Sequence, residues 1–119
     1  MTVQNLSTQG SFITKDGSAI RSILDRTNAP VQNQSLAEAR VAAGGRTERH
    51  YHKVAEELYF ILEGAGEIEL DGERRLIGPG DAILILPVRG TRSPLQSRYA
   101  FSVAARRLMR TRIHIWNNW

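Results

Sequence analysis

The chain has 119 residues, of which 41% are hydrophobic, so it is long enough for one domain with a buried core. It contains no cysteine, so disulfides and thiolate zinc sites are excluded, and any metal must be held by histidine or carboxylate side chains. The sequence shows no apolar run long enough for a membrane span and no secretory signal, so a cytoplasmic location is expected.

The net charge of +4 is divided unevenly along the chain. Residues 1–86 carry all 12 acidic residues and 9 of the 16 Lys and Arg, whereas residues 87–119 carry 7 Arg and no acid. A basic tail is typical of proteins that bind nucleic acid or another anionic partner. This tail has scattered aromatic residues and no nucleic-acid-binding motif, so binding to nucleic acid is the least favoured of the functions considered.

Short apolar segments separated by Gly and Pro turns predict a protein built from strands. Asp71-Gly72 suits a tight hairpin, because both central residues of that turn need a positive φ, and residues 78–81 form a second turn. Residues 1–34 are expected to be an N-terminal extension with a short strand near Ser11–Thr14. Further strands are expected over residues 35–43, 48–53, 57–63, 67–70, 74–77 and 82–86.

Two more strands can follow near residues 99–103 and 113–115, where apolar residues alternate, although residues 104–112 could also form a short basic helix. The 82–86 strand is expected to be buried. The pattern contains no clear helical stretch and no internal repeat. It predicts an all-β barrel or jelly roll in a single domain.

The strand over residues 57–63 is apolar on both faces. Leu58, Phe60 and Leu62 point one way, and Glu57, Tyr59 and Ile61 point the other. A strand of this kind is covered on both faces, either in a sandwich or at a contact between subunits. The sequence therefore predicts a homodimer.

His50 and His52 are two residues apart and share a face if their segment is a strand. A tight turn after them can bring Glu57 beside the pair. Two imidazoles and one carboxylate suit a divalent transition metal and leave positions open for water, substrate or dioxygen. A surface His-x-His pair is also common without a metal, so these three residues alone leave both interpretations equally open.

The wider pattern resembles the first signature motif of the cupin superfamily. The resemblance extends from about Leu36 to Ile85 and includes the Asp-Gly hairpin and the Gly-Pro-Gly-Asp turn. The motif is carried, at the family's spacing, by Gly44, His50, His52, Glu57 and Gly64.

The resemblance implies a double-stranded β-helix barrel over residues 35–119 and a metal bound by His50, His52 and Glu57. Glu56 is a competing carboxylate, but the six-residue gap to Gly64 favours Glu57. The metal would be Fe, Mn, Ni or Zn, and a small molecule would occupy the barrel. The two functions implied are a metal-dependent oxygenase or isomerase-type enzyme, with no identifiable catalytic base, and a non-catalytic small-molecule-binding module.

Tyr59 and Ile61 are expected to line the barrel. Arg46 and Arg49 are expected to be solvated, with no part in the site.

The resemblance fails after Leu86. The second family motif should supply a fourth ligand in a Pro-x-Gly, two residues, His pattern, but no histidine follows Pro87 within reach, and His114 lies far along the chain. Shifting the reading by two bases through Val88 to Ser93 can give Gly-Pro-Arg-His-Ala-Val, which restores the pattern. The same shift near the end can give a sequence that resembles the tails of small bacterial cupins. The sequence therefore supports the hypothesis that residues 87–119 are read out of frame.

Overall fold

The computed structural model describes residues 1–15, 17–87, 99–103 and 111–118, the last two segments as backbone only. Short strands make up most of the regular structure, with one turn of 3-10 helix, η1, at Leu6–Thr8. The strands are β1 (Phe12–Ile13), β2 (Ala19–Leu24), β3 (Gln34–Val41), β4 (Glu56–Glu63), β5 (Gly66–Leu70), β6 (Glu73–Ile77), β7 (Ala82–Ile85), β8 (Tyr99–Val103) and β9 (Thr111–Asn118).

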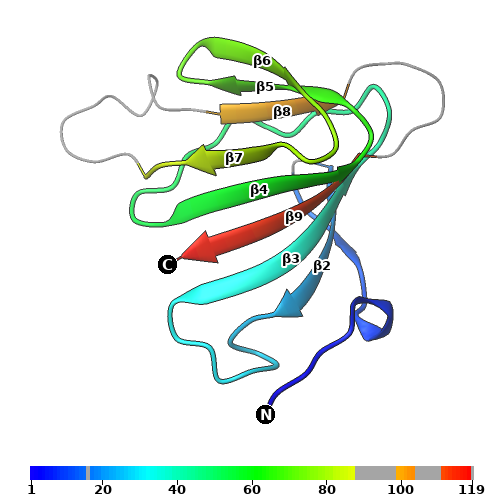
Figure 1. The fold of residues 1–119 in the computed structure, drawn as a ribbon, viewed down its shortest axis with the longest axis vertical. Helices are drawn as coiled ribbons and strands as arrows, with labels where there is room; N and C mark the ends of the chain where they lie inside the picture. The colour runs from blue at the N-terminus through cyan, green and yellow to red at the C-terminus, as the bar shows by residue number, and fades with distance from the viewer. Residues whose placement is uncertain (16, 88–98, 104–110, 119) are drawn as a thin grey trace.

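The strands form two antiparallel sheets that face each other. The larger sheet has the order β1-β2-β3-β9-β4-β7, and the smaller has the order β6-β5-β8. In Figure 1 the smaller sheet lies at the top of the view and the larger one below it. This arrangement confirms the all-β barrel in a single domain. No helix in the described part of the chain is long and apolar enough to cross a membrane.

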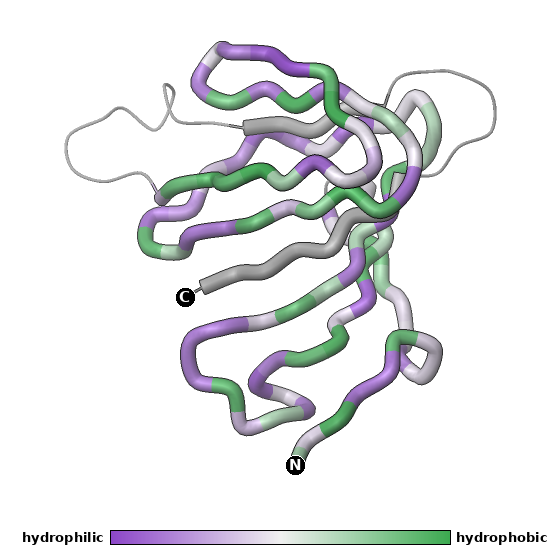
Figure 2. The backbone as a smooth tube through the Cα atoms, in the orientation of Figure 1, coloured by the Kyte–Doolittle hydropathy of each residue, from purple (hydrophilic) through white to green (hydrophobic). Residues whose placement is uncertain are grey.

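The core lies between the two sheets and is built by alternation along each strand. Tyr59 and Ile61 are 5% and 1% exposed and lie in the core cluster, as expected for barrel lining. In Figure 2 hydrophobic and hydrophilic residues alternate along β5, whose Ile68 faces the same core. The cluster of buried residues is Ala39, Val41, Tyr59, Ile61, Ile68, Ile77 and Ile85.

Most of the expected strands are present within two residues of their predicted bounds. The Asp71-Gly72 turn joins β5 to β6 with φ angles of 50° and 85°, as the hairpin requires. The backbone over 99–103 and 111–118 is strand, so the helical alternative is wrong for residues 111–112, while residues 104–110 lie outside the described part. Residues 19–24 form a strand that was not expected, and it pairs with β3.

One expected strand is absent. Residues 48–53 form no ladder, and His50 makes only an isolated bridge. The ring of His50 bonds the backbone carbonyl of Glu48, 2.8 Å away, so that carbonyl serves a local contact instead of a regular ladder.

The outer face of β4 and β7 is apolar and exposed in the single chain. Leu58 and Leu84 stand directly opposite each other and are 45% and 51% exposed. Phe60 and Leu86 are also exposed. The expectation of a buried 82–86 strand is therefore wrong for one face, because the described part of the chain places no second layer over the outer face that β7 shares with the central strand β4.

Candidate metal centre

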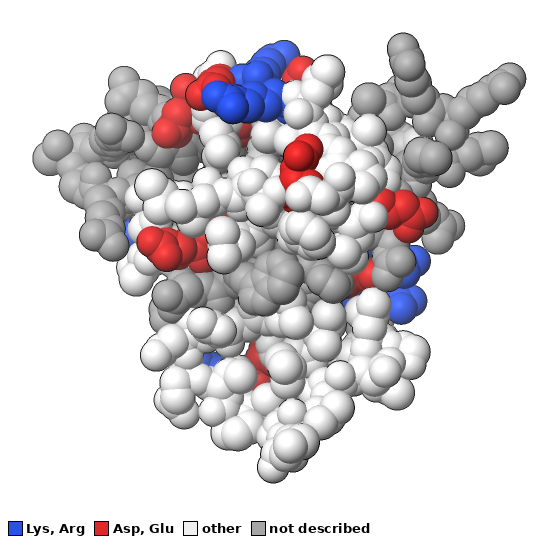
Figure 3. Space-filling view, viewed as in Figure 1, with Lys and Arg blue, Asp and Glu red and all other residues white. Residues whose placement is uncertain are grey.

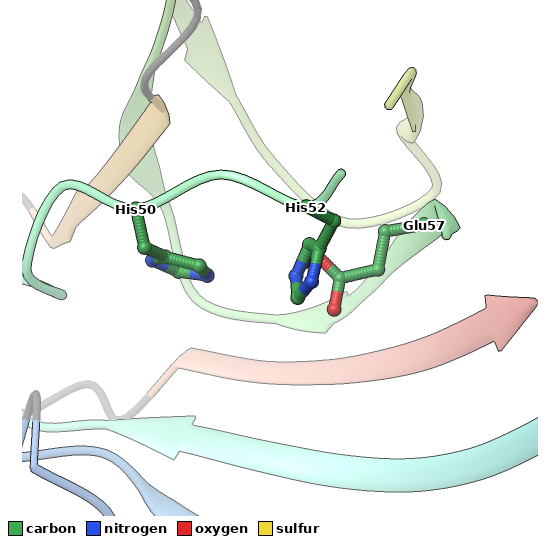
Figure 4. Close-up of side chains that lie close together, drawn as sticks. All are labelled: His50, His52 and Glu57. Carbon is green, nitrogen blue, oxygen red and sulfur yellow. Dashed lines mark ion pairs between the residues drawn. The ribbon is translucent and has the colours of Figure 1, made fainter. Parts of the chain in front are cut away.

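The three candidate ligands come from two adjoining parts of the chain. His50 and His52 lie in the irregular segment between β3 and β4, and Glu57 is the second residue of β4. Figure 4 shows the two imidazole rings and the carboxylate gathered on one side of this segment. The short connection through residues 53–55 returns the chain so that Glu57 meets the histidines.

The ligand atoms of these residues converge. Each residue has one ligand atom within 4.8 Å of those of the other two. Nε2 of His52 lies 3.3 Å from Oε2 of Glu57, and the two ring centroids are 5.5 Å apart with the planes at 89°. The described residues contain no other group of three histidine or carboxylate side chains placed this way.

The tautomer of a neutral His50 ring follows from its hydrogen-bond partner. Nδ1 of His50 lies 2.8 Å from the carbonyl oxygen of Glu48. A carbonyl oxygen can only accept, so Nδ1 carries the hydrogen and donates it. The lone pair of the neutral ring is therefore on Nε2, and a backbone carbonyl in this position is a common outer partner of a metal-binding histidine.

Glu57 and Glu56 differ sharply in their surroundings. Glu57 is 6% exposed and points to the same face as Tyr59, whereas Glu56 is exposed on the opposite face. A buried carboxylate is costly unless it is paired or binds a metal. Glu57 is thus the carboxylate that the structure brings to the histidines.

The donor set fits a first-row divalent metal. Two ligands of one ion, each about 2.1 Å from it, are separated by about 3.0–3.4 Å in octahedral or tetrahedral geometry. The His52–Glu57 separation of 3.3 Å lies in that range. The ligand atoms of all three residues lie within 4.8 Å of one another, and the nitrogen and oxygen donors suit Fe, Mn, Ni or Zn.

The pKa of His52 is raised above its usual value, chiefly by its side-chain hydrogen bond with Glu57, against the opposing effect of burial. A group with a raised pKa stabilises the folded state fully below its unfolded pKa of about 6.5, and this contribution is lost as pH rises through the folded pKa. In metal-free protein we therefore expect Tm to fall between pH 6 and pH 8 more in the parent than in Glu57→Gln. Differential scanning fluorimetry measures this difference.

Bound metal should reverse the sign of that effect. Metal binds the neutral imidazole, so the proton on His52 must leave before the site is filled. The gain in Tm on adding Zn²⁺ should therefore grow as pH rises from 6 to 8. A gain that shrinks over this range would contradict the assignment of His52 as a ligand.

A cavity of about 440 Å³ opens between the edge strands β6 and β7. Ile68, Ile77 and Ile83 line it together with the charged Arg75 and Asp81. None of the three candidate ligands lines this cavity, so the metal group and the β6–β7 opening are separate features of the barrel.

Arg49 is exposed, as expected, but it also makes an ion pair that the sequence did not indicate. Its Nη2 lies 2.5 Å from Oε1 of Glu69 in β5. The pair is distant in sequence, with β4 between its members, and no spacing pattern indicates it. Arg46 is exposed, as expected.

Comparison with known proteins matches part of the chain to the cupin domain and to two curated relatives. The family model of the cupin domain matches residues 37–89. An uncharacterized protein of Methanocaldococcus jannaschii, MJ1618, is 47% identical over 76 residues, which is 64% of this chain and 61% of that protein. Protein SchB of Streptomyces halstedii is 32% identical over 69 residues, which is 58% of this chain and 50% of that protein.

Among solved structures, the polyketide cyclase RemF of Streptomyces resistomycificus superimposes with a TM-score of 0.79 at 20% identity. The match covers 99% of this chain and 79% of RemF. At this identity the likeness shows the fold alone. The matched part of the chain spans only about half to three fifths of the two curated relatives.

Proposed function

Given that this chain belongs to the cupin superfamily, we propose that it binds one divalent transition metal ion through His50, His52 and Glu57 and acts on a small organic molecule in its barrel. The observation that carries the proposal is the convergence of these three side chains, whose ligand atoms all lie within 4.8 Å of one another.

A metal held by three protein ligands keeps positions open, and there it supplies Lewis-acid or redox chemistry to a bound molecule. The protein's own part is to orient the His50 ring through the Glu48 carbonyl and to keep the Glu57 carboxylate buried beside His52. The first candidate is an oxygenase- or isomerase-type enzyme, and the second is a non-catalytic small-molecule-binding module. The name of RemF agrees with a small organic substrate but does not identify one.

Elemental analysis of protein prepared without chelator or histidine tag tests the proposal. We expect near-stoichiometric iron, manganese, nickel or zinc, and the element found would select the reactions to assay. Protein with only trace metal, and no uptake of any of the four ions on titration, would contradict it.

We also propose that the chain forms a homodimer through the exposed apolar face of β4 and β7. Leu58→Glu with Leu84→Glu places two charges on that face and should convert a dimer into a monomer, measured by sedimentation equilibrium. Leu76→Glu is the matched control, because Leu76 is 81% exposed on β6 and should leave the dimer intact. A monomeric parent, or a dimer that survives the double substitution, would overturn this proposal.

The frame of residues 87–119 is a further proposal about the gene. The family match ends at residue 89, close to the point where acids disappear and the second motif fails. We expect resequencing across Leu86 to reveal a shifted frame. That frame would replace the Arg-rich tail with a sequence that has a histidine in the second family motif. A clean open frame in homologous strains that encodes the same tail would rule the shift out.

A further inference from the structure

The segment that carries His50 and His52 is not held by a strand ladder. Residues 47–53 make only an isolated bridge, at His50, and Arg46 makes another just before them. A ladder normally fixes the direction of successive side chains. Other contacts must therefore set where the two imidazole rings lie.

Arg49 provides one such contact. It stands between Glu48 and His50, and its Nη2 lies 2.5 Å from Oε1 of Glu69, the fourth residue of β5. The side chain of Glu69 is 17% exposed, against 54% for Arg49, so the carboxylate is the better anchored partner. Arg49 thus ties the histidine segment to the smaller sheet.

Glu69 is itself held by the neighbouring strand. Its Oε2 lies 3.1 Å from Nη2 of Arg74, which stands directly opposite in β6. Nη1 of Arg74 lies 3.6 Å from Oε1 of Glu67. In Figure 3 basic and acidic atoms lie side by side at the top of the view, over the β5–β6 hairpin. The hairpin is fixed by its backbone ladder, so these ion pairs connect a rigid element to the irregular one.

We propose that the ion-pair chain Arg49–Glu69–Arg74 is a positioning device for His50. Arg49 and His50 are adjacent, so the bond from Arg49 to Glu69 holds the backbone from which the His50 ring projects. The carbonyl of Glu48 then orients the ring itself through Nδ1, 2.8 Å away. The link from this device to metal binding rests on the proposed role of His50 as a ligand.

If the Arg49–Glu69–Arg74 ion pairs only stabilised the fold, breaking them would lower Tm. Exposed ion pairs add little to folding stability, and Arg49 and Arg74 are both more than half exposed. Breaking the Arg49–Glu69–Arg74 ion pairs should therefore change the tautomer of the His50 ring and the metal affinity, while leaving Tm nearly unchanged. Arg75→Gln is the matched control, because Arg75 lies on the same hairpin and its ion pair with Glu73, at 2.6 Å, does not reach the histidine segment.

The first readout needs no metal. In metal-free parent protein, ¹⁵N spectra should show His50 with its hydrogen on Nδ1, the tautomer that the Glu48 carbonyl selects. Arg49→Gln should lose this preference and show a mixture of tautomers, Arg49→Lys should restore most of it, and Arg75→Gln should match the parent. Unchanged His50 spectra in Arg49→Gln, or an equal change in Arg75→Gln, would overturn the positioning role.

The second readout is the affinity for Co²⁺, followed by absorbance. Arg49→Gln and Glu69→Gln should each weaken binding about 10-fold, as loss of an outer partner of a metal ligand commonly does. The double variant should bind no more weakly than either single one, because both remove the same contact. If the parent binds no metal while the His50 spectra still respond to Arg49→Gln, the positioning role stands and the proposed function falls. If the parent binds Co²⁺ and Arg49→Gln changes neither the His50 spectra nor the Co²⁺ affinity, the proposed metal site stands and the positioning role falls.

Discussion

Replacing His50 and His52 together by alanine should lower the affinity for a divalent transition metal by about 1,000-fold or more. Loss of an outer partner of a ligand already costs about 10- to 100-fold, and this change removes two of the three proposed direct ligands. Glu57 would remain as a single buried carboxylate, which holds a first-row ion weakly when no imidazole shares it. Titration with Co²⁺ and elemental analysis of the purified variant measure the loss.

Glu56→Gln is the control for this double substitution. It removes a carboxylate next to Glu57 in the chain, but one that is exposed on the opposite face of β4. We expect it to bind metal like the parent. If the double histidine variant kept a full equivalent of tightly bound metal, the site would have to lie elsewhere.

Sequence patterning predicted the buried residues of β4 well, because alternate residues of a strand point to the same face. Tyr59 and Ile61 were expected to line the barrel and are almost fully buried. The same parity separates Glu57 from Glu56, and the structure places Glu57 with the histidines. The Asp71-Gly72 turn was equally readable, since few residue pairs adopt two successive positive φ angles.

Patterning was less successful where a contact joins residues distant in the chain. The segment over residues 48–53 was expected to be a strand, yet its Glu48 carbonyl accepts from the ring of His50. The Arg49–Glu69 pair likewise depends on how β5 passes the histidine segment, which no local spacing records. The exposed outer face of β7 was misjudged for a related reason, since an apolar run does not show whether another layer covers both faces of its strand.

Ile61→Ala should destabilise the folded chain by about 3 kcal/mol, within the range for removing a large aliphatic side chain from a packed core. Ile61 is 1% exposed and belongs to the cluster that joins the two sheets, so its loss leaves a cavity that neither sheet can readily close. Urea unfolding at fixed pH measures the change. Leu76→Ala is the control, because Leu76 is 81% exposed and its truncation should cost little.

The same variant separates the core from the site. Ile61 and Glu57 lie on one face of β4, but Ile61 is four residues further along, and it is not among the convergent ligands. Below its unfolding temperature, Ile61→Ala should therefore bind Co²⁺ with parental affinity although its free energy of unfolding is reduced. A parallel loss of affinity and stability would mean that the ligands are placed by core packing along β4. Retained affinity would mean that the site is positioned by the contacts of the histidine segment itself, which are the His50–Glu48 bond and the Arg49–Glu69 ion pair.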